Sequence, residues 1–253
     1  MYVQAPFEAI ENVPFVPATF VCATNVFGLS TSVFVSVPPV VSGALVSERL
    51  TDAELWNDYR QEARKYITRA RECGVRIEFD PTGKHLEEFL AVYNATMNRR
   101  NATSQYYFPK SFFEALLHSL DGQFTLAHAV VNGQILSSEI LLFSQDHAYS
   151  FLGGTMPEAF PLGANYLLKD ESFKHCRELG IGAVVLGGGY QPNDGILRYK
   201  RHFGTSGERP FLLGRKTYDA DLAERLLEAR RGWERARGNE WAPTPGYFPT
   251  YRS

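Results

Sequence analysis

Between residues 51 and 120, apolar side chains recur every three or four positions, the spacing of an amphipathic helix. The first run opens with Thr51-Asp52-Ala53-Glu54, the pattern of a capping box, and ends at Gly74, so we expect one helix over this stretch. A short strand and two further helices are expected over residues 75–79, 84–99 and about 110–120.

The pattern then changes to period two, which is typical of strands. Residues 124–131 and 134–143 flank Asn132-Gly133, the strongest short signal for a β-hairpin. A third strand is expected over residues 147–152, with Gly153-Gly154 interrupting it. The elements expected after it are a helix at 162–179 ending at Gly180, strands at 183–186 and 211–216, and a charged helix at 219–237. This order predicts an α/β (α+β) fold with a mixed, partly antiparallel sheet and flanking helices.

The first 49 residues differ from the rest of the chain. They carry four charges and are rich in Val, Phe, Pro and Thr, which predicts strands over residues 13–24 and 31–37. So apolar a segment should pack on the remainder rather than stand alone. We therefore expect a reduced N-terminal half-domain at 1–49, one domain at 50–237, and an irregular Pro- and aromatic-rich tail at 238–253.

Composition narrows the class of protein. The net charge of −2 gives no global basic field, although a local basic patch can still bind phosphates. Three widely spaced cysteines predict reduced thiols. The sequence has no run of 18 apolar residues, so we expect no membrane-spanning helix. The N-terminus lacks the basic region of a signal peptide, so we expect a cytoplasmic protein. The six histidines show no metal-binding spacing, and we expect no metal site.

Candidate chemistry gathers in LGGGYQPNDGILRYKRHFG, residues 186–204. Three glycines, Gly187, Gly188 and Gly189, follow an apolar strand, and they indicate either close approach of a ligand to the backbone or a tight turn. Asp194 is expected to cap a short helix that carries Lys200. Lys200 is the catalytic candidate, and the alternative is that Lys200 and Arg201 are a solvated surface pair.

Four stretches, in order, resemble the Fem-type aminoacyl-tRNA-dependent peptidyltransferases, whose fold is that of the GNAT superfamily. They cover residues 50–77, 89–116, 149–180 and 186–204. The similarity is to the second of the two GNAT-like halves of full-length Fem proteins, so the first half is reduced or missing here. In this fold the strand before the long helix splays from the next strand, and the acyl donor enters there.

The resemblance implies an aminoacyltransferase that needs no cofactor. It would move an amino acid from aminoacyl-tRNA to the amine of a peptide-containing acceptor, either a peptidoglycan precursor or a peptide natural-product intermediate, including a carrier-bound one. The amine must be deprotonated, the ester carbonyl positioned and the oxyanion held by donors. Tyr199-Lys200-Arg201-His202-Phe203 resembles the family's Phe-Lys-x-x-Phe element, which makes Lys200 the catalytic residue and gives Tyr199 a packing role.

Further residues are assigned to this reaction. Glu139, an acid in the middle of a strand, is a candidate general base, and the alternative places it on an exposed face. The residues expected to bind substrate are Tyr107, Tyr149, Thr155, Asn165, Gly187, Gly188, Gly189 and Tyr199. The residues expected to bind tRNA phosphates are Arg64, Lys65, Arg69, Arg99, Arg100 and Arg201, and the alternative is that these are solvated helix faces and helix-terminal cations.

Residues 160–165 bear on which acyl donor the chain is predicted to use. They stand where a GNAT enzyme binds the pyrophosphate of acetyl-CoA through the pattern Gln/Arg-x-x-Gly-x-Gly/Ala, and here Phe160 and Asn165 depart from it while Gly163 matches. This mismatch favours aminoacyl-tRNA. An acyl-CoA-dependent N-acyltransferase of ordinary GNAT type and a non-catalytic binding module remain alternatives, and the sequence leaves the oligomeric state open.

Overall fold

The computed structural model describes residues 51–189, 194–204, 217–245 and 247–252, and the backbone of residues 33–35 and 213–215. The chain divides into a central unit, Val40–Pro210, and a terminal unit made of Met1–Pro39 and Phe211–Ser253. The domain boundaries expected at residues 49 and 237 remain predictions.

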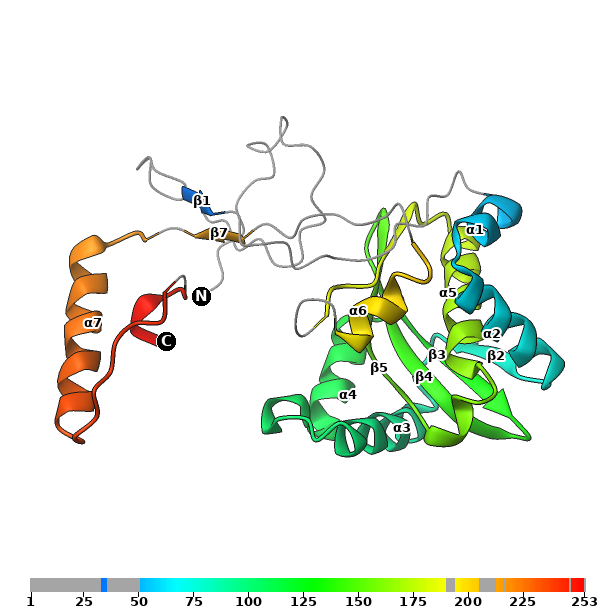
Figure 1. The fold of residues 1–253 in the computed structure, drawn as a ribbon, viewed down its shortest axis with the longest axis horizontal. Helices are drawn as coiled ribbons and strands as arrows, with labels where there is room; N and C mark the ends of the chain where they lie inside the picture. The colour runs from blue at the N-terminus through cyan, green and yellow to red at the C-terminus, as the bar shows by residue number, and fades with distance from the viewer. Residues whose placement is uncertain are drawn as a thin grey trace. The chain divides into compact units, whose positions relative to one another are not determined.

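A five-stranded sheet forms the middle of the central unit (Figure 1). Its strands, in spatial order, are β2 (Arg76–Asp80), β3 (Phe124–Val131), β4 (Gln134–Phe143), β5 (His147–Thr155) and β6 (Ala183–Val185). The first four pair antiparallel, and β5 pairs parallel with β6. The predicted mixed α/β sheet is therefore confirmed.

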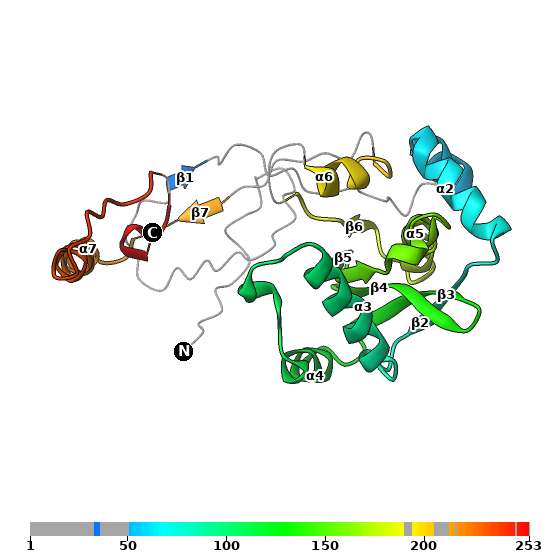
Figure 2. The ribbon, with the colours of Figure 1, turned by 60° about the horizontal axis from the view of Figure 1, so that its bottom comes forward.

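Helices cover both faces of this sheet, because the strands bury side chains on both sides. Ala127 and Leu141 pack with the helices α1 (Asp52–Asp58), α2 (Gln61–Glu72) and α5 (Ala164–Glu178). Leu126 and Ile140 point to the other face, under α3 (Leu86–Arg99) and α4 (Lys110–Ser119) (Figure 2). The short helices of this unit are η2 (Ser104–Tyr106), η3 (Pro157–Ala159) and α6 (Gly195–Lys200).

The helix expected over residues 51–74 is two helices, which corrects the prediction. The capping box of Thr51 and Glu54 is present, but the chain turns to an extended conformation at Tyr59. Tyr59 is buried, and its hydroxyl donates to Asp170 of α5 at 3.1 Å. Arg64 donates to the carbonyl oxygens that this break leaves without helical partners, at 2.7 Å from Tyr59 and 3.2 Å from Trp56.

The predicted hairpin is confirmed, since Asn132 and Gly133 have φ of 50° and 79°. Gly153 and Gly154, in contrast, lie inside β5 rather than interrupting it. A Cβ on Gly154 would lie 2.6 Å from the carbonyl oxygen of Val92, so glycine is what lets α3 pack this close to the strand.

The pairing of β4 with β5 has an irregularity. Glu139 pairs with Gly153 and Leu141 pairs with Ser150, so the interval that spans two residues on β4 spans three on β5. This is a β-bulge, and it brings Ser150 and Gly153 to the same face of the sheet.

Strands β5 and β6 stay together for three residue pairs, from His147 with Ala183 to Tyr149 with Val185. Within the described residues, the rest of β5 has no partner on this side. The expected splay is present, and no strand in the described part of the chain pairs with the edge formed by residues 150–155.

In the terminal unit, β1 (Val33–Val35) pairs antiparallel with β7 (Leu213–Arg215). The strand expected over 13–24 lies outside the described residues. The helix α7 (Ala220–Arg235) begins at Asp219, whose side chain accepts from the Leu222 N–H at 2.8 Å, and η4 (Thr250–Arg252) lies in the tail. Among the described helices of the chain, none is both long enough and apolar enough to cross a membrane.

Candidate active site

The short helix α6 holds Lys200 beside the glycine loop. Asp194 caps the helix as expected, accepting from the Leu197 N–H at 2.7 Å. The Lys200 amine is partly buried and donates to the carbonyl oxygen of Gly188 at 2.7 Å, so Lys200 does not belong to a solvated surface pair. Arg201 is the C-terminal cap residue of α6.

The pKa of the Lys200 amine is lowered to about 8, chiefly by burial and also by the ammonium of Lys169. The carboxylates of Asp194 and Glu139 oppose this shift. Lys200 is therefore mainly a cation at neutral pH, held where it can stabilise negative charge.

The glycines fit around these two side chains. Gly187 has φ of +69°, and the Lys200 Nζ lies 3.6 Å from where its Cβ would be. A Cβ on Gly189 would overlap the carboxylate of Asp194. The absence of a side chain at Gly189 thus allows close approach by Asp194, whereas Gly187 is favoured by its positive φ.

Tyr199 fastens α6 to the start of α5. Its hydroxyl donates to the backbone carbonyl of Asn165 at 2.9 Å, and its ring packs edge-on against Tyr166 and Phe203. Burial raises the pKa of Tyr199 well above its ordinary value. The side-chain oxygen of Asn165 is buried and has no hydrogen-bond partner among the described residues.

A buried polar network lies next to this anchor. Glu139 is 5% exposed, so the alternative that placed it on an exposed face is wrong. Its pairing with Ala127 puts it on the face of the sheet that α5 covers. The Lys169 ammonium contacts this carboxylate, and the hydroxyls of Ser150 and Ser172 each donate to it at 2.8 Å.

Lys169, Ser150 and Ser172 were not among the predicted site residues. One signal could have pointed to Lys169 and Ser172. Asn165, Lys169 and Ser172 recur at the spacing of one helix face within a helix whose other buried residues are largely apolar. A polar stripe on a buried helix face indicates a polar partner on the sheet, which here is Glu139.

The far end of β5 is held by α3. Thr96 accepts from the Thr155 N–H at 2.9 Å, and the Thr155 hydroxyl lies 2.8 Å from that of Ser137. Arg99 donates to the Thr155 carbonyl at 3.1 Å and lies over the ring of Phe160, 4.9 Å from its centre. Its guanidinium is therefore already engaged by the protein.

The structure separates the predicted site residues into three places. Beside the splay of β5 and β6 it brings together Glu139, Asn165, Gly187, Gly188, Gly189, Tyr199, Lys200 and Arg201. Tyr149 is in the last residue pair of β5 with β6, but its pairing with Leu142 places it on the opposite face of the sheet from Glu139. At the end of α3 lie Thr155, Arg99, Arg100 and Tyr107, whose hydroxyl donates to Asn98 at 3.0 Å. On α2 lie Arg64, Lys65 and Arg69.

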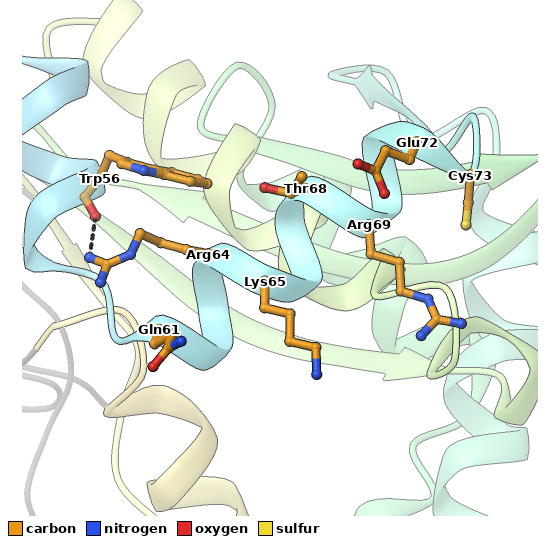
Figure 3. Close-up of a pocket in the computed structure, with 8 residues that line it drawn as sticks. All are labelled: Trp56, Gln61, Arg64, Lys65, Thr68, Arg69, Glu72 and Cys73. Carbon is orange, nitrogen blue, oxygen red and sulfur yellow. Dashed lines mark hydrogen bonds between the residues drawn. The ribbon is translucent and has the colours of Figure 1, made fainter.

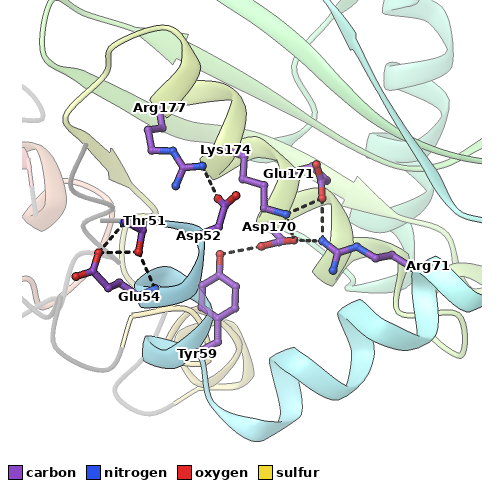
Figure 4. A network of polar contacts seen from close by, with 9 residues as sticks. All are labelled: Thr51, Asp52, Glu54, Tyr59, Arg71, Asp170, Glu171, Lys174 and Arg177. Carbon is purple, nitrogen blue, oxygen red and sulfur yellow. Dashed lines mark hydrogen bonds and ion pairs between the residues drawn. The ribbon is translucent and has the colours of Figure 1, made fainter. Parts of the chain in front are cut away.

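The helix α2 is fixed to α5 by charged side chains (Figure 4). Arg71 donates to Asp170 at 2.6 Å and to Glu171 at 3.0 Å, and Lys174 contacts both acids. Arg71 therefore faces α5.

The described residues hold no group of three or more His, Cys, Asp or Glu side chains that could bind a metal ion.

A family model described as an acetyltransferase (GNAT) domain matches residues 57–201. The chain belongs to the GNAT family. This match spans every helix and strand of the central unit from α2 to α6. No curated protein sequence matches the chain.

Solved structures share the GNAT fold at low identity. FemX has a TM-score of 0.58 and 17% identity over 68% of this chain and 59% of its own. L-PGS from Bacillus licheniformis has a TM-score of 0.53 and 16% identity over 79% of this chain and 66% of its own. A conserved protein of unknown function from Bacteroides thetaiotaomicron has a TM-score of 0.55 and 13% identity over 73% of this chain and 62% of its own. This chain thus spans less than two thirds of each.

The GNAT fold implies an acyl-CoA site at the start of α5, and the residues there fit it poorly. Gly163 has φ of +74°, and a Cβ at this position would overlap the carbonyl of Tyr66 in α2. The Tyr66 ring stacks on Tyr166 with centroids 4.9 Å apart. The carbonyl oxygen of Tyr66 thus lies beside the loop, where a pyrophosphate needs N–H donors. In addition, Phe160 stands in place of the polar residue that anchors the pyrophosphate.

Proposed function

We propose that the chain is an aminoacyltransferase that moves an amino acid from aminoacyl-tRNA to the amine of a peptide-containing acceptor. The observation that carries this proposal is the placement of Lys200. Lys200 is on α6, and its amine donates to the carbonyl of Gly188. Tyr199 anchors α6 on α5, beside the edge of β5 with which no described strand pairs.

The chemistry requires charge stabilisation rather than a protein nucleophile. The acceptor amine attacks the carbonyl carbon of the aminoacyl ester, a C–N bond forms, and negative charge develops on the carbonyl oxygen. The ester C–O bond then breaks, and the proton lost by the amine ends on the ribose hydroxyl. The partly buried Lys200 ammonium would stabilise the developing charge, and such donors are typically worth about 10²–10³ in rate.

The choice of donor rests on the poor fit of acyl-CoA. The start of α5 presents Phe160, the packed Gly163 and the Tyr66 carbonyl where the pyrophosphate would lie. An aminoacyl ester does not need this loop, because its acyl group is carried by the 3′ end of a tRNA. The resemblance to the Fem family and the fold shared with FemX agree with this choice.

The acceptor is proposed as a peptide amine, from a peptide natural-product intermediate or a peptidoglycan precursor. This chain covers 59% of the FemX chain. The proposal therefore does not require an acceptor pocket between two complete GNAT-like halves. We place the reaction in the cytoplasm, where charged tRNA is made.

A transfer assay tests the proposal. The protein is mixed with radiolabelled aminoacyl-tRNAs and a panel of peptide amines, and amide products are separated from hydrolysed amino acid. Wild-type protein should form product, and Lys200→Met should lose at least 100-fold in rate. The proposal fails if no aminoacyl-tRNA supports amide formation while acetyl-CoA does.

A second function, acyl-CoA-dependent N-acylation, is favoured by one observation. The N–H groups of Ala164 and Asn165, at the start of α5, have no acceptor among the described residues and could face an anion. This alternative predicts a rise in melting temperature with CoA. Absence of any transfer from either donor would instead support a binding module without catalytic activity.

A further inference from the structure

The outer face of α2 carries cations that the protein does not neutralise. Lys65 and Arg69 are exposed, and neither has a carboxylate partner among the described residues. Arg71, on the same helix, is paired with Asp170 and Glu171, and Arg64 is used by the carbonyl oxygens at the end of α1. The helix therefore separates cations that hold the fold from cations that face solvent.

Lys65 and Arg69 border a shallow depression (Figure 3). Lys65 and Arg69, four positions apart on one helix face, project on the same side of α2 as the amide of Gln61. The hydroxyl of Thr68 lines the depression from the other side of the helix. One carboxylate, Glu72, lies at the far end. Cations combined with amide and hydroxyl donors are the groups that proteins use to contact phosphate oxygens.

The face begins beside the candidate active site. The Arg60 N–H donates to the carbonyl of His202 at 2.9 Å, and His202 follows Lys200 by two residues. From Arg60 to Arg69 the helix extends about 13 Å away from that point. A polyanion with one end at Lys200 would thus continue along α2.

The face is also rigid. Asp170, 1% exposed, accepts from Tyr59 at 3.1 Å and from Arg71 at 2.6 Å, and Lys174 lies 2.8 Å from it (Figure 4). These contacts join both sides of the α1–α2 break to α5. Cations on a fixed helix lose less freedom on binding than cations on a loop.

We propose that the outer face of α2, formed by Gln61, Lys65, Thr68 and Arg69, binds the phosphate backbone of the acceptor arm of the tRNA. This inference rests on the proposed function, since it assumes that the donor enters with its 3′ end at Lys200. The contacts are to phosphates, so the face binds without reading base sequence.

The test is a charge reversal on this face. K65E/R69E should weaken binding of deacylated tRNA at least tenfold at low salt, and the slope of log affinity against log salt should fall by about two. The matched control is K84E/R225E, the same lysine and arginine change of charge at exposed side chains outside α2 that have no carboxylate partner among the described residues. The control should bind tRNA as the wild type does.

A small donor separates docking from chemistry. An aminoacyl ester of a short oligonucleotide with no acceptor stem should be used equally by wild type and K65E/R69E, whereas full-length aminoacyl-tRNA should be used poorly by the variant. Equal tRNA affinity of wild type and K65E/R69E, or equal weakening by the control, overturns the proposal. So does binding to phosphatidylglycerol vesicles without affinity for tRNA. If wild type binds tRNA through this face but transfers from neither donor, the proposed function fails and the docking face stands.

Discussion

Lys169 and Glu139 form an ion pair in the interior of the central unit, with 8% and 7% of their side chains exposed. A buried pair of this kind contributes little net stability compared with well-packed apolar side chains. Its position gives it another role. Lys169 on α5 and Glu139 on β4 are two of the charges that act on the Lys200 amine, together with Asp194 at the start of α6.

Removing either charge of this pair should shift the pH dependence of transfer, in opposite directions for Lys169 and Glu139. If transfer needs the Lys200 ammonium, the wild-type rate falls as pH rises through its pKa of about 8. Lys169→Met removes a like charge, raises the pKa of Lys200 and moves this limb to higher pH. Glu139→Gln removes an opposite charge and moves the limb to lower pH. Rate–pH profiles of the three proteins measure both shifts.

The two variants also control for each other. Each breaks the same buried contact, so loss of stability alone would affect both in the same direction. A pH limb that moves the same way in both variants, or in neither, contradicts the electrostatic role of the pair.

Lys200 itself is expected to matter for rate and not for folding. Lys200→Met removes a partly buried cation whose one hydrogen bond among the described residues is to the Gly188 carbonyl, so its melting temperature should match or exceed that of wild type. The transfer rate should fall by about 10²–10³. Lys200→Arg keeps the charge and should retain part of the rate. Thermal unfolding and initial rates, measured on the same preparations, test both statements.

Asp170 is the central acceptor that joins α1 and α2 to α5. Asp170→Ala leaves the buried Tyr59 hydroxyl without an acceptor and removes one partner each from Arg71 and Lys174. The free energy of unfolding should fall by about 1–3 kcal/mol, because a buried donor loses its partner. Glu171→Ala, at a side chain that is 32% exposed, should cost less than about 1 kcal/mol. Urea unfolding of both variants gives the comparison, and equal losses would contradict the central role of Asp170.

Gly154 is required by the packing of α3 on β5. A Cβ there would lie 2.6 Å from the Val92 carbonyl and 2.7 Å from the Thr96 hydroxyl, so Gly154→Ala should destabilise by about 1–3 kcal/mol. Gly232→Ala provides the contrast, because this helical glycine has nothing within 4 Å and the change should stabilise α7 by up to about 1 kcal/mol. Chemical unfolding of both variants measures the two effects. A Gly154→Ala protein as stable as wild type would show that α3 can shift without cost.

Local patterns predicted most of the elements. The hairpin at Asn132-Gly133, the cap at Asp194 and the capping box at Thr51 each depend on residues a few positions apart, and each is present. The break at Tyr59 could not be predicted in this way. It depends on a hydrogen bond to Asp170, 111 positions further along the chain.

The candidate site shows the same division. Lys200 and the glycines were visible in one short stretch of sequence, whereas the polar stripe of α5 that includes Lys169 indicated only that a polar partner exists. That this partner is Glu139 follows from the packing of α5 on the sheet, which no local pattern contains. The assignments of individual residues to donor and acceptor remain predictions.

The bulge in β5 has a consequence for how the length of this strand can vary. Ser150 contacts Glu139, while the neighbouring Phe151 is 41% exposed and lies in the three-residue interval opposite two residues of β4. Removing Phe151 would restore regular pairing and leave Ser150 beside Glu139. Removing Ala148 instead would shift the register by one and turn the hydroxyl of Ser150 to the opposite face of the sheet. The polar interior thus tolerates a deletion at one position of this strand and is lost by a deletion three positions earlier.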